Sequence, residues 1–154
     1  MLRVTKLCDY AIVLLTHLAQ AGRDGSVAAR DLADRSEVPL PTVSKILKQL
    51  GREGLVVSQR GAKGGYRLAR PPTEVSVADI IGAIEGPIAM TDCSLEGGGL
   101  CDVEDNCRVR ANWRLISSVV EDALSRISLA DMAGPLPPHL VRLGKAPREA
   151  ASGN

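Results

Sequence analysis

Aromatic residues are nearly absent from this 154-residue chain, which has two tyrosines, one tryptophan and no phenylalanine. Recognition of nucleic acid by stacking bases on aromatic rings is therefore nearly excluded. The core must be built from Leu, Val, Ile and Ala. A chain of this length makes about one domain and buries roughly two thirds of its unfolded surface, which excludes a large multidomain enzyme.

Long apolar runs are also missing. The longest candidate, residues 11–15, falls far short of the ~18 residues of a membrane span, and no secretory signal opens the chain. We therefore expect a soluble cytoplasmic protein with no membrane partner. In that compartment the four cysteines are expected to be thiols or metal ligands rather than disulfides.

The residues of common catalytic sites are scarce as well. The chain has two histidines, no plausible Ser/His/Asp set and no phosphate-binding glycine loop that opens a helix. No enzymatic function is predicted.

Charge is distributed unevenly along the chain. Residues 1–72 carry 12 Lys and Arg against 6 Asp and Glu, whereas residues 73–107 carry no basic residue and 8 acidic ones. Residues 108–154 carry 7 basic residues against 4 acidic ones. The formal net charge of +1 therefore conceals a basic head joined to an acidic middle.

Apolar spacing predicts three helices in the basic head: one capped by Thr5 that runs to about residue 20, one over about residues 28–36, and one from about residue 41 that ends near residues 51–54. Two short strands follow at residues 55–59 and 66–69, joined by a basic, glycine-rich turn. The predicted buried stripe of the first helix is Leu7, Tyr10, Ala11, Leu14 and Leu18, and that of the third is Val43, Ile46, Leu47 and Leu50.

This order of elements is typical of a winged helix-turn-helix, whose second motif helix enters the major groove while the hairpin touches the backbone. Thr42 and Ser44 are placed for base edges, and the basic side chains for phosphates. The candidate DNA-binding residues are Thr42, Ser44, Lys45, Lys48, Arg60, Lys63 and Arg67. The alternative is that these are ordinary solvated charges.

The second half of the chain contains a helix opened by Ser76 with Asp79 in a capping-box pattern, and a longer helix over residues 108–127. Apolar residues at steps of three and four give the longer helix a continuous seam, which needs a partner. The seam residues are Val109, Trp113, Ile116, Val120, Leu124 and Ile127. We expect a homodimer that binds double-stranded DNA at a pseudo-palindromic operator.

The predicted fold class is therefore mostly α with a small β-hairpin: a winged helix-turn-helix domain plus a long C-terminal dimerisation helix. Its expected regions are a DNA-binding region (1–72), a linker helix with a cysteine-bearing loop (73–107), a dimerisation helix (108–133) and a tail (134–154).

Three cysteines, Cys93, Cys101 and Cys107, lie within fifteen residues of the acidic middle. Their gaps of seven and five residues match neither a zinc ribbon nor the common ferredoxin runs. Neighbouring carboxylates would raise the thiol pKa values, so thiolates here need the charge of a metal. Unpaired structural cysteines and a disulfide-forming sensor are the alternatives.

Four pieces of the sequence together resemble the Rrf2 family of bacterial regulators. They are MLRVTKLCDYA (1–11), PTVSKILKQL (41–50), RGAKGGYRL (60–68) and the three cysteines, and the resemblance covers roughly residues 1–133. The chain looks most similar to family members that regulate iron–sulfur assembly genes. The resemblance implies a homodimeric regulator, with repression favoured. It also implies an iron–sulfur cluster held by Cys93, Cys101 and Cys107, with 2Fe–2S favoured over 4Fe–4S.

Two departures concern the fourth ligand. The first cysteine gap is seven residues instead of the five of the IscR-like pattern, and Arg110 stands where that pattern has a histidine. The NsrR-like pattern uses an aspartate from the first helix of the other subunit, which corresponds to Asp9 here. Cys8 is the alternative ligand.

Two hypotheses compete with that of an iron–sulfur regulator. One is a small iron–sulfur carrier or redox protein whose basic head docks onto another protein. The other is a plain winged helix with structural cysteines, which predicts a colourless protein.

Overall fold

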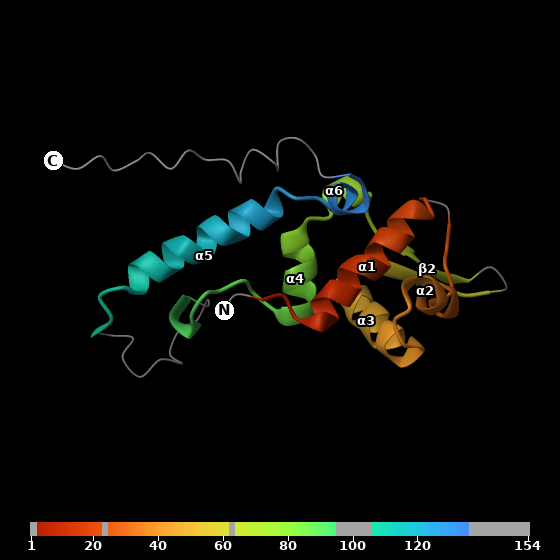
Figure 1. Cartoon of the computed structure of the whole chain (residues 1–154), viewed down its shortest axis with the longest axis horizontal. Coiled ribbons are helices and arrows are strands. Elements are labelled where there is room, and N and C mark those ends of the chain that lie inside the picture. The colour runs from red at the N-terminus through yellow and green to blue at the C-terminus, as the bar shows by residue number, and fades with distance from the viewer. Residues whose placement is uncertain (1–2, 23–24, 62–63, 95–105, 136–154) are drawn as a thin grey trace.

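The computed structural model describes residues 3–22, 25–61, 64–94 and 106–135 of the chain. Figure 1 shows the winged helix at one end and a long projecting helix at the other. The elements are α1 (Lys6–Gln20), α2 (Ala29–Ser36), α3 (Leu40–Arg52), β1 (Val56–Gln59), β2 (Gly65–Leu68), η1 (Pro72–Glu74), α4 (Val77–Glu85), η2 (Asp92–Ser94), α5 (Arg110–Ser125) and α6 (Leu129–Ala133).

Helix α1 lies at the centre of the core. It begins after Thr5, whose hydroxyl accepts a hydrogen bond from the Cys8 backbone N–H at 3.3 Å and so satisfies a free donor of the first turn. Its buried residues are Cys8, Ala11, Leu14, Leu15 and Leu18, all at most 1% exposed. The predicted stripe was partly wrong, because Leu7 and Tyr10 are only half-buried and Cys8 and Leu15 occupy the core.

The turn between α2 and α3 is tight. Glu37 adopts a left-handed conformation with φ of +56°, and the following Pro39 caps α3. Pro41 lies in the first turn of α3, where its missing N–H costs no helical hydrogen bond. The predicted buried stripe of this helix is confirmed, since Val43, Ile46, Leu47 and Leu50 are all fully buried.

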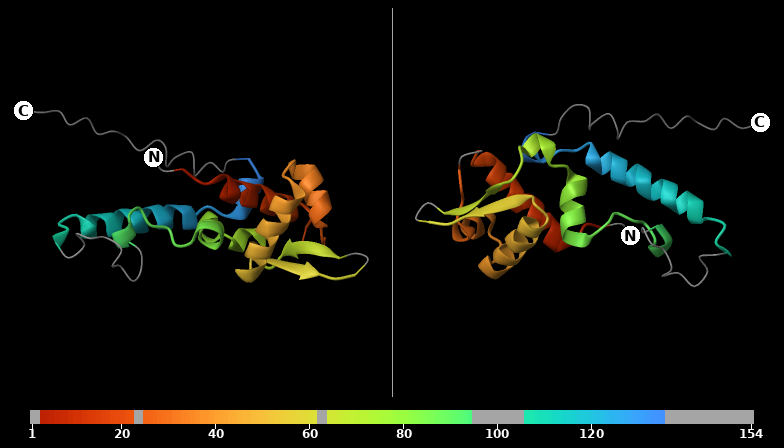
Figure 2. Two further views of the ribbon diagram at one scale, coloured as in Figure 1. Left: turned by 90° about the horizontal axis from the view of Figure 1, so that it is seen from below. Right: turned by 180° about the vertical axis from the view of Figure 1, so that it is seen from behind.

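The hairpin pairs β1 with β2 in antiparallel register, with Val56 opposite Leu68 and Gln59 opposite Gly65. A third segment joins it, because Val27 exchanges two backbone hydrogen bonds with Tyr66 at 2.9 and 2.8 Å. This pairing ties the wing to the connection between α1 and α2. Figure 2 shows the hairpin projecting beside α3.

The chain then turns back across the core. Ser76 and Asp79 form the predicted capping box at the start of α4, which ends at Gly86 with φ of +92°. Ser128 and Asp131 form a second capping box on α6. The Leu129 N–H donates to the Val75 carbonyl at 2.7 Å, which fixes α6 beside η1 and against α1.

Helix α5 contacts α4 and η2 and otherwise leads away from the winged helix (Figures 1 and 2). Among the described helices, none is long and apolar enough to cross a membrane.

The close approach of the Val27 backbone to Gly65 can be tested by substitution. A Cβ at this position would lie 2.6 Å from the Val27 carbonyl oxygen and 2.7 Å from its carbon, so no larger residue fits without breaking the third-strand pairing. We expect Gly65→Ala to lower the free energy of unfolding by about 1–3 kcal/mol, the usual cost of overpacking. Chemical denaturation monitored by circular dichroism measures it.

Gly82 provides the control, because it lies within α4 and a Cβ built there has no atom within 4 Å. Gly82→Ala should be neutral or stabilise by up to about 1 kcal/mol. Equal destabilisation by the two substitutions would contradict the assigned close approach.

Candidate nucleic-acid interface and cysteine-bearing segment

The outer face of α3 carries the polar side chains expected from the sequence. Ser44, Lys45 and Lys48 are exposed, and Thr42 is half-exposed in the first turn. The buried stripe holds the opposite face of the helix on the core, so these side chains point outward together. They form a polar and cationic helix face on the side that the core leaves open.

An open groove of about 830 Å³ separates this face from the wing. Its lining includes Ser44 and Lys48 from α3 and Ser58 from β1, and it also includes Arg52 at the end of α3. Arg52 was missed from the sequence because the stripe analysis ended at Leu50. Its contribution depends on where β1 lies, which the helical pattern does not reveal.

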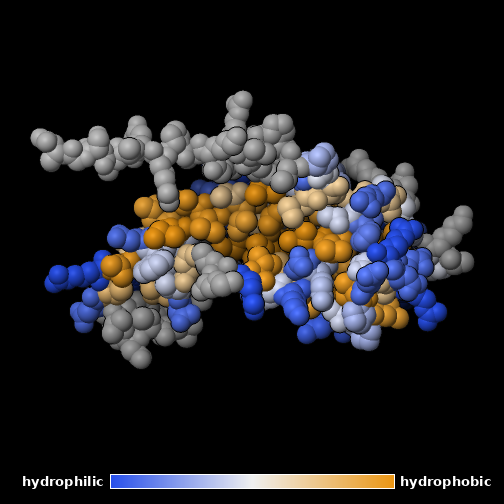
Figure 3. Space-filling model, viewed as in Figure 1, coloured by the Kyte–Doolittle hydropathy of each residue, from blue (hydrophilic) through white to orange (hydrophobic). Residues whose placement is uncertain are grey.

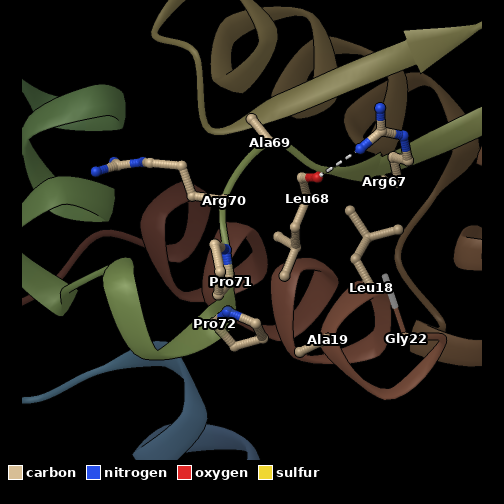
Figure 4. A pocket seen from close by; sticks show the side chains of 9 residues that line it. All are labelled: Leu18, Ala19, Gly22, Arg67, Leu68, Ala69, Arg70, Pro71 and Pro72. Carbon is tan, nitrogen blue, oxygen red and sulfur yellow. Dashed lines mark hydrogen bonds between the residues drawn. The ribbon is translucent and has the colours of Figure 1, made fainter. Parts of the chain in front are cut away.

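The wing residues differ in how freely their charges are presented. Arg60 is exposed at the tip side of β1, whereas Lys63 lies outside the described residues. Arg67 is half-buried, and its Nη1 donates to the Leu68 carbonyl at 3.4 Å (Figure 4). Figure 4 also shows Arg70 directed toward α4, where its Nη2 lies 3.7 Å from Asp79 Oδ2. Arg60 is therefore the least constrained of the described wing arginines.

The pocket drawn in Figure 4, of about 200 Å³, lies between the end of α1 and the chain that leaves β2. Leu18, Leu68, Pro71 and Pro72 form its apolar walls. Of its two arginines, Arg70 is directed toward α4, whereas Arg67 is directed toward the Leu68 carbonyl.

The cysteine-bearing segment is attached to α5 by side-chain hydrogen bonds. Ser117 is buried, and its hydroxyl accepts from the Met90 backbone N–H at 3.0 Å. Arg114 Nε donates to the Cys93 carbonyl at 3.4 Å. These two contacts hold η2 against α5.

Cys93 is 5% exposed, and its Sγ lies 3.2 Å from the Thr91 hydroxyl, which can donate to it. Cys107, just before α5, is half-buried, and both thiols are unpaired. Cys101 lies outside the described residues. Within the described ranges, no three His, Cys, Asp or Glu side chains gather as a metal site.

Cys8 and Asp9 have opposite environments although they are adjacent. Cys8 is fully buried, and this burial, together with the hydrogen-bonded carboxylate of Glu85, raises the pKa of its thiol to about 11. The thiol therefore stays protonated and packed in the core. Asp9 is exposed in the first turn of α1, where a carboxylate also complements the helix dipole.

Known proteins match this chain over most of its length. The family model for Rrf2, described as an iron-dependent transcriptional regulator, matches residues 4–135. An HTH-type transcriptional regulator of Mycobacterium tuberculosis strain H37Rv is 36% identical over 146 residues, covering 92% of this chain and 88% of the relative. The regulator IscR of Photorhabdus laumondii is 31% identical over 131 residues, covering 85% of this chain and 79% of the relative.

Solved structures agree with the sequence relatives. CymR, the global cysteine regulator of B. subtilis, superposes with a TM-score of 0.67 at 28% identity, covering 86% of this chain and 97% of CymR. IscR of T. potens superposes with a TM-score of 0.65 at 28% identity, covering 96% of this chain and 93% of that structure. The relatives of this chain are transcriptional regulators, not enzymes, and its described helices and antiparallel hairpin fit a winged-helix regulator fold. The chain therefore belongs to the Rrf2 family of DNA-binding transcriptional regulators.

Proposed function

We propose that this chain represses genes for iron–sulfur cluster assembly and senses iron or oxidative status through a bound iron–sulfur cluster. The observation that carries the proposal is that Cys93 and Cys107 are unpaired thiols beside α5, in a chain whose other end is a winged helix. The relatives include both an IscR and a cysteine regulator, so family membership alone leaves the signal open.

DNA binding is assigned to α3 and the wing. Helix α3 enters the major groove, with Thr42 and Ser44 near base edges and Lys45 and Lys48 near phosphates. The hairpin adds Arg60, Lys63 and Arg67 on the flanking backbone, and we add Arg52 because it lines the groove between the two elements. Since the DNA of a bacterial cell lies in its cytoplasm, we place the protein there.

The salt dependence of binding tests this interface. Each lost phosphate contact lowers the slope of log affinity against log salt concentration by about 0.9. We expect Lys45→Ala combined with Lys48→Ala to flatten the slope by about two units, measured by fluorescence anisotropy on a labelled duplex. Adding Lys63→Ala should flatten it further.

Arg126→Ala is the matched control, because Arg126 is an exposed basic residue that caps the far helix α5. Its slope should equal that of the wild type. Unchanged binding after removal of all three lysines would overturn the interface, and equal affinity for every duplex would favour the alternative of a protein-docking carrier.

The partner of α5 is proposed to be a second copy of this chain. Large apolar side chains stay exposed along it: Val109 is 50% exposed, Leu115 65% and Val119 59%. Trp113 and Ile116 extend the same surface, which Figure 3 shows as a continuous apolar band over α5. Two-fold pairing on this face brings two α3 helices to one operator, which a pseudo-palindromic site requires.

Charges placed on this face should separate the subunits. Leu115→Asp with Val119→Asp removes the most exposed apolar side chains of α5 without touching the core. We expect folded monomers with weak operator binding, measured by light scattering coupled to size exclusion. Ser118→Asp, on the polar side of the same helix, should leave a dimer; a monomeric wild type at micromolar concentration would contradict the assignment.

The cluster ligands are assigned to Cys93, Cys101 and Cys107, with Asp9 of the partner subunit as the fourth. The two described thiols fit this role because each is unpaired and the Thr91 hydroxyl, 3.2 Å from the Cys93 sulfur, is able to donate to it. Cys8 does not fit, because it is fully buried behind the surface that a partner would approach. When bound, the cluster supplies sensitivity to oxidants and iron supply.

Substitution of the two candidate fourth ligands tests the assignment. Asp9→Ala should give a folded dimer whose visible absorbance, after purification without oxygen, is altered or decays faster than that of the wild type, because an oxygen ligand has been lost. Cys8→Ala should retain the wild-type spectrum with a small loss of stability. Cys93→Ser should be colourless; a colourless wild type would support the plain winged helix instead.

A further inference from the structure

Gln49 is a half-buried polar residue of α3 whose side chain is directed toward α4. Its neighbour Lys48 is exposed, whereas the Gln49 side chain reaches α4 and donates from Nε2 to the carbonyls of Ala83 and Ile84, at 3.0 Å each. The last carbonyls of a helix have no partner within it. Gln49 therefore caps the C-terminal end of α4 from the recognition helix.

A second helix is bonded to the same end of α4. Glu85 Oε1 accepts from the backbone N–H of Thr5 at 3.0 Å and from its hydroxyl at 2.9 Å. Thr5 is the residue that caps α1. The end of α4 is thus held between the start of α1 and the last turn of α3.

The chain that leaves α4 continues directly to the cysteine-bearing segment. Only Gly86–Ala89 separates Glu85 from Met90, whose backbone N–H is bonded to Ser117 of α5. Figure 1 shows α4 standing between α5 and the α1–α3 pair. The end of α4 therefore lies on one of two connections between the winged helix and α5. The other connection leaves α5 through Ile127, whose carbonyl accepts from the Val77 N–H at 2.8 Å, and leads to α6.

We propose that Gln49 is a positioning residue that fixes the angle of the recognition helix to the end of α4 and so links α5 to operator affinity without touching DNA. Its two hydrogen bonds are directional, whereas the apolar contacts between α3 and α4 are not and permit sliding. The inference rests on the proposed operator binding by α3 and needs no cluster.

Because thermodynamic coupling is reciprocal, the coupling between α4 and operator binding can be measured as a change in operator affinity or as a change in the stability of α4. If the position of α4 alters operator affinity, operator binding must in turn stabilise the end of α4. In the wild type, operator DNA should slow amide hydrogen exchange across residues 83–90, although these residues lie away from the proposed DNA face. Without the Gln49 bonds this slowing should disappear.

The test uses the full chain without a cluster and a duplex selected from a random-sequence pool by the wild type, beside a scrambled duplex of equal length. Gln49→Met keeps an unbranched side chain of similar length but removes both donors. We expect it to weaken binding to the selected duplex by roughly 5- to 20-fold, within the usual range of coupling effects. Binding to the scrambled duplex and the salt slope should not change, because the phosphate contacts are intact.

Gln20→Met is the matched control, since Gln20 is exposed at the end of α1. It should behave as the wild type in binding and in hydrogen exchange. If Gln49→Met does not fold, Gln49→Asn withdraws the amide by one methylene and carries the same expectations.

Two failures are distinguishable. A wild type that binds the selected and scrambled duplexes equally overturns the proposed function. A wild type that discriminates between them, with Gln49→Met matching it in selectivity and in exchange of residues 83–90, overturns this inference alone.

Discussion

The rest of the structure depends on the burial of α1 in a core that has no phenylalanine. Small and aliphatic side chains at Cys8, Ala11 and Leu14 let α2, α4 and α6 approach one central helix, and β2 contacts it as well. Close packing of this kind leaves little empty space in the core, so the side chains there keep fixed positions. The same constraint decides between adjacent residues: Cys8 becomes part of the core with a protonated thiol, and Asp9 stays exposed in the first turn of α1.

A core of this size cannot also cover α5. One side of that helix is held by Ser117, Val120 and Leu124 near α4 and the Gly86–Met90 connection, while Leu115 and Val119 face solvent. An apolar face of this width on a short chain is costly unless a partner covers it. In the proposed dimer, the interface that covers this face also sets the distance between the two α3 helices, so subunit association and operator geometry depend on the same contacts.

Local signals made much of the fold predictable. The stripe of α3 follows from helical periodicity, and the Ser76 and Ser128 capping boxes follow from residues three apart in sequence. The phase of α1 was harder to predict, because apolar residues surround it and Leu15 competes with Leu7 for the core. Leu115 and Val119 were left out of the predicted seam because they lie beside its steps of three and four. For the candidate site, the exposed face of α3 followed from the sequence. The groove lined by Arg52, the pairing of Val27 with Tyr66 and the reach of Gln49 to α4 join residues far apart in the chain, and no local pattern encodes them.

The uneven distribution of charge along the sequence corresponds to an arrangement in space, and the long-range contacts connect its two ends. The basic face on α3 and the wing lies at one end of the molecule, and the cysteine-bearing segment is held against α5 at the other (Figure 1). Screening limits direct electrostatic influence between charges separated by more than about 10 Å at ordinary salt. Coupling between the two ends, which the proposed function requires, must therefore pass through packed elements that both ends contact. The end of α4 is such an element, since it bonds to Thr5 at the start of α1 and to Gln49 on α3. Asp9 lies one turn beyond Thr5 in α1, and Thr5 is bonded to Glu85 at the end of α4. Under the proposed function, a partner subunit that binds Asp9 would act on the start of α1, which is bonded to the helix end that Gln49 caps.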